Sequence, residues 1–192
     1  MLKQFGRPDN TVSQFFHSAV NYLLYVNPLF VVRAIDSNVA LNAVPTAQTP
    51  VLLKNEADYA SATLTGISVV ARYPGALGNA IKISAADDTA FSTWAYKSNF
   101  TFTPESGEFN MVVIDATGEI TGTAGTVLET YELMSKTAGA KKPDGTTAYV
   151  VNAVKDQSSY IYIGDETAIN FAESGSLGVY EDTLQGGVDG ND

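Results

Sequence analysis

The chain has 192 residues, no cysteine and a formal net charge of −10 at neutral pH, and 45% of its residues are hydrophobic. This composition suits one globular domain or two small ones, and it excludes disulfides and thiolate chemistry. No basic residue follows Lys155, whereas eight acidic residues do, so we exclude nucleic acid and anionic membranes as partners. We interpret the acidity as a contribution to solubility.

The clearest predicted helix covers residues 11–26. Thr11 and Gln14 have the spacing of a capping box. Apolar residues then recur at helical spacing and form one wide face, at Phe15, Phe16, Ala19, Val20, Leu23 and Leu24. Pro28 disfavours a helical conformation at Asn27, so we expect the helix to end there.

An apolar run follows this helix at residues 29–35. Its length and β-branched content predict a central strand. Residues 36–38 have the composition of a turn, and we expect a short helical turn at 39–43. Residues 44–62 show little periodicity, so we predict a loop with one edge strand.

The middle of the chain carries the strongest turn signal. Residues 67–70 are rich in β-branched side chains, which predicts a strand. Pro74 and Gly75 then favour a tight turn, and residues 78–79 give a second reversal signal. The alternation at residues 81–84 predicts a half-buried strand. Two strands should therefore flank a rigid turn, with no helix after it, that carries no nucleophile, base or metal ligand.

The rest of the chain completes the predicted fold class. The patterns predict strands at 91–96, 109–115, 127–134, 159–163 and 181–184, a short return at 120–123, and a helix at 146–155. The strand at 127–134 should form a hairpin with 109–115. We therefore expect an α+β fold with a mostly antiparallel or mixed, sandwich-like sheet flanked by a few short helices. A division into two small subdomains near residue 105 is open.

The sequence assigns no catalytic, cofactor-binding or metal-binding residue. His17 is the only histidine, and no pattern pairs it with a nucleophile or with zinc ligands. Residues 75–78 lack the lysine of a P-loop and the third glycine of a dinucleotide fingerprint. Residues 189–192 lack the spaced ligands of a calcium loop, which predicts a frayed acidic end. The sequon at 99–101 is interpreted as chance, and we expect no enzyme.

Several segments together resemble the tail sheath proteins of contractile-tailed bacteriophages. The most specific is Tyr-Pro-Gly-x-x-Gly-Asn within residues 71–79. The others are similar to the family's segments before and after its first helix and at its domain junction, at residues 5–8, 21–24, 29–36 and 184–190. They consist mainly of glycine, proline and core positions, so they indicate a fold and no particular chemistry.

The resemblance implies a structural virion protein whose subunits stack as six-membered rings around a tail tube above a baseplate. Contraction of this sheath would drive the tube through the host envelope, without a cofactor. The subunit would be made in the host cytoplasm. Residues 1–43 and 63–192 would form the core domain of the family, and 44–62 would lie where relatives carry an inserted domain. The family's N-terminal segment and C-terminal domain would be missing, so the chain alone would be monomeric.

Two other classes of function stay open. A virion module that binds host-surface carbohydrate could use exposed tyrosines, of which the chain has ten. Tyrosine is also common in sheets, and this second interpretation is favoured. An acid–base hydrolase would need two convergent carboxylates, and no sequence feature pairs two of them.

Overall fold

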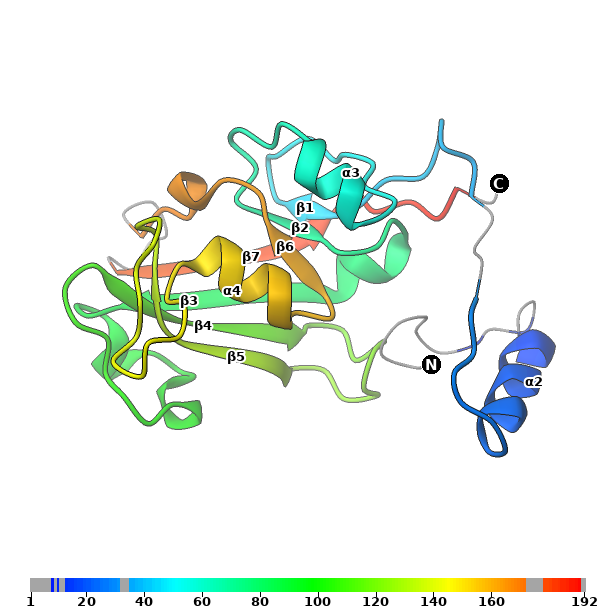
Figure 1. Ribbon diagram of the computed structural model, residues 1–192, viewed down its shortest axis with the longest axis horizontal. Helices are drawn as coiled ribbons and strands as arrows, with labels where there is room; N and C mark the ends of the chain where they lie inside the picture. The colour runs from blue at the N-terminus through cyan, green and yellow to red at the C-terminus, as the bar shows by residue number, and fades with distance from the viewer. Residues whose placement is uncertain (1–7, 9, 11–12, 32–34, 172–177, 191–192) are drawn as a thin grey trace.

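The fold is an α+β arrangement built on antiparallel sheets, as the sequence predicts. The computed structural model describes residues 8, 10, 13–31, 35–171 and 178–190 (Figure 1). Its main sheet has the order β1-β7-β3-β4-β5, with bounds Val44–Pro45, Val179–Gln185, Ile81–Asp87, Glu108–Asp115 and Thr126–Ser135. A smaller sheet pairs β2 (Val69–Ala71) with β6 (Ile161–Ile163). All pairings between the named strands are antiparallel.

The described helices are short. The α-helices are α2 (Ser13–Leu23), α3 (Glu56–Ser61) and α4 (Val150–Gln157). Four 3-10 turns, η1 to η4, cover Ala76–Ala80, Phe91–Thr93, Lys97–Asn99 and Glu166–Ala168. Among the described helices, none combines the length and apolar content that crossing a bilayer requires.

The central strands β3 and β4 of the main sheet are buried on both faces. Phe109, Met111 and Val113 of β4 point to one face, where they pack with residues of β2, β6 and α4. Val112 and Ile114 point to the other face, where they pack beneath the segment 88–103. This alternation follows the two-residue period of a strand. The continuous apolar composition of β4 is therefore that of a central strand.

The segment 88–103 covers the second face with aromatic side chains. Trp94 stacks on Phe100 with 5.4 Å between ring centroids, and its indole N–H donates to the hydroxyl of Ser84 at 2.9 Å. Two corrections follow. The strand predicted at 91–96 is instead η2 followed by a turn, because its aromatic side chains gather over the sheet. Ser84 is buried, so β3 is a central strand and not a half-buried one.

The outer side of the small sheet is covered by residues 44–67. Asn42, fully buried, joins this cover to β2, because its amide donates to the carbonyls of Leu53 and Ala71. The predicted edge strand is present as β1, but α3 was missed. The helix α3 begins at an Asn55 cap, whose side chain accepts from the Asp58 N–H at 2.9 Å. The predicted helical turn at 39–43 is wrong, because Leu41 and Asn42 form extended bridges.

The remaining elements agree with the sequence except at two places. The hairpin of β4 and β5, the strand β6 and the final strand β7 are confirmed. The helix predicted at 146–155 begins only at Val150, because Thr147 and Tyr149 form bridges with preceding segments. The return strand predicted at 120–123 is a loop whose backbone N–H groups bond to Asp115.

The N-terminal region differs most from expectation. The predicted N-terminal helix is confirmed as α2, with residues 11–12 outside the described residues, but it ends at Leu23 and not at Asn27, because Leu24 and Tyr25 donate to carbonyls three residues back in a turn. Residues 29–31 and 35 are not in a strand, so the predicted central strand is wrong where it is described; residues 32–34 lie outside the described part. Of the segment 5–8, only Pro8 is described. In Figure 1, α2 and residues 24–31 lie apart from the sheets. The run therefore has no neighbouring strand there with which to pair.

Candidate functional site

The described residues that could take part in catalysis or bind a metal ion do not lie close together in the structure. His17 lies on the surface of α2, edge-on to Phe16 with ring centroids 5.8 Å apart. In the described ranges, no three His, Asp or Glu side chains are placed to hold a metal ion. A cavity of about 340 Å³ lies beside Trp94, and the Glu181 carboxylate in its wall forms an ion pair with Lys82. These surroundings offer no matched nucleophile and base.

The turn at 73–79 is shaped by close backbone approaches. Gly75 has φ 139°, as predicted from the turn signal, and its N–H donates to the Leu41 carbonyl at 3.0 Å. The 3-10 helix η1 follows directly, which corrects the expectation that no helix does. A Cβ on Gly78 would lie 2.9 Å from the Cβ atoms of Ala43 and Ala71. Gly78 is thus required by space, because three chain segments meet there.

The same turn is bound to the end of the chain. The Asn79 amide donates to the Gly187 carbonyl at 3.1 Å and accepts from the Gly187 N–H at 2.8 Å. Asp189 accepts from the Ala76 N–H at 3.1 Å, and Gly190 accepts from the Asp36 N–H at 2.7 Å. The predicted frayed end is therefore wrong for residues 189–190, and residues 191–192 lie outside the described part. We call residues 73–79 and 186–190 together the turn junction.

Arg72 directs its charge into the molecule. Its guanidinium donates to the carbonyls of Ser158 and Lys155 at 2.7 and 3.3 Å. Its central carbon lies 4.5 Å from the ring centroid of Tyr162, a cation–π distance. Glu56 approaches it at 4.0 Å and pairs with the Lys155 ammonium at 3.2 Å. Arg72 therefore ties the end of β2 to α4 and β6.

Asp115 is a buried carboxylate that organises a loop. It accepts from the backbone N–H groups of Gly118, Ile120 and Thr121 and from the Thr121 hydroxyl, at 2.7 to 3.1 Å. Burial alone would raise its pKa, but these hydrogen bonds hold the pKa below its ordinary value. A carboxylate held ionised by so many donors is a structural anchor and a poor general acid.

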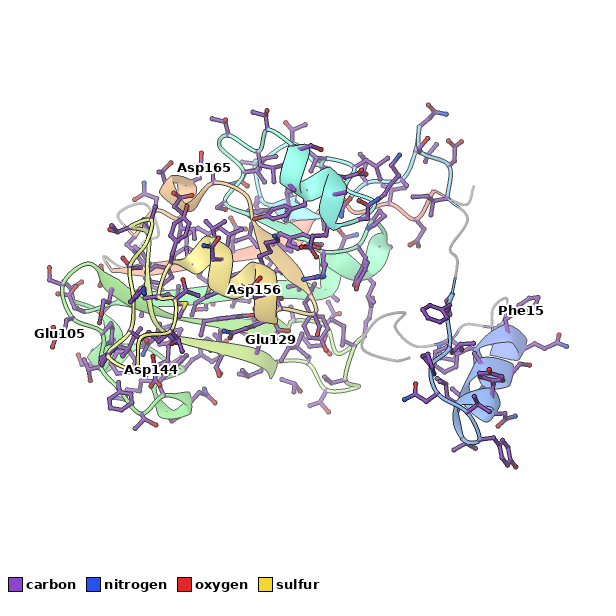
Figure 2. The ribbon with its side chains drawn as sticks, in the orientation of Figure 1. Phe15, Glu105, Glu129, Asp144, Asp156 and Asp165 are labelled. Atoms are coloured by element: carbon purple, nitrogen blue, oxygen red, sulfur yellow. The ribbon has the colours of Figure 1, made fainter. Side chains whose placement is uncertain are left out.

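Glu129 has a similar structural role on β5. Its carboxylate accepts from the Ser158 hydroxyl, the Tyr131 hydroxyl and the Ser159 N–H, at 2.7 to 2.8 Å. These bonds attach β5 to the end of α4. Figure 2 shows Asp165 on a different part of the domain, where it accepts from the Gly66 N–H at 2.8 Å. The two carboxylates thus serve separate loops and form no acid–base pair.

Most tyrosines within the sheets are part of the core, as the favoured interpretation predicts. Tyr131, Tyr160, Tyr162 and Tyr180 are buried. Burial raises the pKa of Tyr180 to about 12, although the Ser68 hydroxyl bonded to it acts in the opposite direction. These rings are therefore withdrawn from any sugar-binding surface.

Exposed apolar side chains are concentrated in residues 13–31, which we call the N-terminal apolar segment. Among the described residues, ten large apolar side chains are exposed, and seven belong to this segment: Phe15, Tyr22, Leu24, Tyr25, Val26, Phe30 and Val31. No residue of α2 is buried. The sequence predicts the apolar face but not whether it is buried, so the exposed surface is seen only in the structure.

Comparison with known proteins gives one informative relative. The tail sheath protein of Salmonella phage ViI is 25% identical over 288 residues, which cover 98% of this chain and 44% of the relative. The chain is thus similar to a phage tail sheath protein. It spans less than half the length of that relative. No family model matches the chain.

Three of the segments that carry the sequence resemblance meet in space. The Tyr-Pro-Gly-x-x-Gly-Asn turn and the Gly186-Gly187 segment form the turn junction through the paired bonds of Asn79. Asp36, the last residue of the segment 29–36, reaches the same place through Gly190. A Cβ on Gly187 would collide with the Gly75 carbonyl oxygen, which explains the glycine in physical terms. These three segments therefore form one structural junction of the fold, whereas residues 21–24 lie at the end of α2, apart from the sheets, and of residues 5–8 only Pro8 is described.

Proposed function

We propose that this chain is part of a tail sheath subunit, a structural component of a phage virion that assembles with other sheath subunits. The observation that carries the proposal is the match of 98% of the chain to a tail sheath protein. The chemistry of the charged groups fits this role as well, because the carboxylates of Asp115 and Glu129 and the half-buried guanidinium of Arg72 hold parts of the fold together. A non-enzymatic role follows from this proposal.

The finer proposal is that the subunits form rings around a tail tube, on a baseplate, after synthesis in the host cytoplasm. Contraction would then move each subunit as a rigid body and drive the tube through the host envelope. The turn junction supports this view, because it binds three distant chain segments through backbone and amide hydrogen bonds. A block of this kind can transmit force without changing its own fold.

We also propose that residues 44–62 mark the place where longer relatives carry an inserted domain. The aligned region of the ViI protein covers 288 residues against the 192 of this chain, so the relative has residues without a counterpart here. Residues 54–57 are exposed at the outer side of the small sheet, where an insertion would leave the strands unchanged. The domain division at 1–43 and 63–192 belongs to this proposal.

The experiment is immunogold electron microscopy of particles from the phage or prophage that encodes the chain. An antibody against the purified chain should label the tail shaft along its whole length, in extended and contracted particles. An antibody against the major capsid protein is the control. Label at the tail tip alone would favour a host-binding module, and particles without the chain would contradict the proposal.

A further inference from the structure

We propose that the cavity beside Trp94 binds one neutral sugar ring. This site goes beyond the proposed sheath role and does not rest on it. The cavity has a volume of about 340 Å³. A single buried water needs on the order of 15 Å³, and ligand sites begin at about 300 Å³. The cavity therefore has room for one small molecule and not for a long chain.

The register of the strands places this cavity over β3 and β7. Ile83 of β3 packs in the core on one face of the main sheet, so its neighbour Ser84 points to the other face. Glu181 of β7 pairs directly with Ser84, and it therefore lies on the same face. The aromatic side chains of the segment 88–103 cover Val112 and Ile114 of β4 on this face. The cavity lies beside this cover, where β3 and β7 contribute to its wall.

The lining of the cavity is buried on one side and exposed on the other. Ser84 and Trp94 belong to the lining and are 1% and 5% exposed. The exposed residues of the lining include Thr89, Thr93 and Glu181. The cavity is therefore open to solvent, and a small ligand can enter it without a change of fold.

The polar groups of the lining can both donate and accept hydrogen bonds. The Ser84 hydroxyl accepts from the Trp94 indole N–H at 2.9 Å, and among the described residues its own hydrogen has no acceptor. The hydroxyls of Thr89 and Thr93 already donate within residues 87–90, at 2.7 and 3.1 Å, so they are left to accept. A sugar hydroxyl is both a donor and an acceptor, so neighbouring hydroxyls of one ring match this lining.

The charges at the cavity favour an uncharged ligand. The Glu181 carboxylate forms an ion pair with Lys82 through one of its oxygens, and in the described part of the chain the other oxygen has no partner. That second oxygen can accept a charge-assisted hydrogen bond from a hydroxyl. The ion pair is neutral as a whole, so it attracts neither cations nor anions strongly. The net charge of −10 further disfavours an anion.

Aromatic side chains supply the apolar part of the site. Tyr96 is half-buried in the lining, and its ring centroid lies 5.6 Å from that of Trp94 at an interplanar angle of 68°. Ala95 and Val179 add apolar surface. The C–H groups of a sugar ring pack on aromatic rings, while its hydroxyls bond to polar groups at the edge. The cavity offers both kinds of contact, as a site for a neutral sugar requires.

The test is a titration of the intact chain with the methyl glycosides of glucose, galactose and N-acetylglucosamine. Trp94 is the only tryptophan of the chain, so its fluorescence reports on this cavity. We expect saturation with a dissociation constant of about 1 to 50 mM for at least one glycoside, because few groups hold a single ring. A change that stays linear for all three, and that glycerol reproduces, would overturn the proposal. Saturation by sodium sulfate at a lower concentration than by any glycoside would also overturn it.

A matched pair of variants locates the binding. Glu181→Gln keeps the shape of the side chain and should weaken binding at least fivefold, because the amide has one acceptor oxygen and no charge. Glu119→Gln is the control, because Glu119 is exposed and lies outside the lining. Circular dichroism checks that both variants are folded. Equal affinities of the two variants would overturn the proposed site.

Amide chemical shifts of the unaltered chain give a second measurement. The shifts that change with the glycoside should cluster at residues 84, 89–96 and 179–181. The amides of α3, which belongs to a separate part of the domain, should not change. Shift changes centred elsewhere would overturn the site. A chain that labels the tail shaft but binds no glycoside would reject only this site, and the sheath proposal would stand.

Discussion

Two regions of similar apolar character differ in burial in this protein. The strand β4 is almost entirely buried, and its side chains pack on both faces of the main sheet. The N-terminal apolar segment is also rich in large apolar side chains, yet α2 has no buried residue. The difference lies in partners, because β4 has β3 and β5 beside it and the described part of the chain gives the segment no sheet to join.

An apolar sequence pattern therefore indicates that burial of the side chains is favourable, but it does not indicate which part of the structure covers them. In the sheet domain, residues 36–171 and 178–190, the apolar side chains of β3 and β4 are covered by other parts of the same chain. In the N-terminal apolar segment the apolar side chains stay exposed, and residues 13–31 contain no charged Asp, Glu, Lys or Arg side chain among them.

The largest expected effect on stability comes from a substitution in the buried strand β4. Phe109 is 1% exposed and packs on Phe171 with ring centroids 5.2 Å apart. Phe109→Ala should lower the free energy of unfolding by about 4 kcal/mol, because it removes a buried ring and leaves a cavity. Phe15→Ala removes the same ring from a 77% exposed site and should change it by less than about 0.5 kcal/mol. Urea denaturation measures both, and equal losses would contradict the contrast.

The next effect concerns the polar anchor of the sheet domain. Asp115→Asn should cost about 3 kcal/mol, because the amide replaces an acceptor oxygen with a donor that faces backbone N–H groups. Asp88→Asn, at an exposed position, removes the same charge and should cost about 0.5 kcal/mol or less. Chemical denaturation at pH 7 compares the two variants. A similar loss for both would mean that charge, and not the bonded loop, matters.

The same variant predicts a pH dependence. The pKa of Asp115 is lowered in the folded protein by bonds that outweigh the opposing effect of burial. Its stabilising contribution is therefore complete above the ordinary unfolded pKa of about 3.9, and it is lost as the pH falls through the lower folded pKa. The stability gap between the wild type and Asp115→Asn should be constant near pH 7 and shrink below about pH 4. Thermal melts across this range measure the gap.

The sequence predicts those elements correctly whose turn residues and pairing strand lie close together in the chain. The β4–β5 hairpin and the turn at Gly75 follow from alternation and turn residues alone. The failures share a cause, which is that distant contacts decided the conformation. The aromatic residues of 91–96 bind over the sheet through Trp94, and Leu41 is extended because it bridges to Val188. Neither contact leaves a periodic signal in the sequence.

The candidate surface could be predicted only in part. The apolar face of residues 11–26 is plain in the sequence, but its exposure is not, because a core helix shows the same spacing. The sequence feature that points to this exposure is the absence of charged residues from the helix. Amphipathic helices that cover a soluble domain usually carry charged residues on the outer face, and α2 has none. The turn junction was predicted as a shape, and its pairing with residues 186–190 required the fold.

A smaller effect tests whether the turn junction stabilises the sheet domain. Gly187→Ala places a methyl group against the Gly75 carbonyl oxygen, so the backbone must move, at a cost of about 2 kcal/mol. Gly66→Ala is the matched control, since its Cβ would meet open space and only the positive φ of 78° opposes it. That control should cost about 1 kcal/mol. The reverse order in urea denaturation would show that backbone strain outweighs crowding at the junction.

The smallest expected effect is the most informative about the comparison. Because α2 buries nothing against the sheet domain, removal of residues 1–31 should leave the melting temperature of the domain within about 2 °C of the intact chain. Amide hydrogen exchange of the intact chain checks this without truncation. The N–H groups of α2 should exchange far faster than those of β3 at micromolar concentration, because an isolated 11-residue helix is marginal in water. Protection that rises with protein concentration would locate the missing partner in a second copy, whereas strong protection in the dilute monomer would mean that the segment has a partner within its own chain.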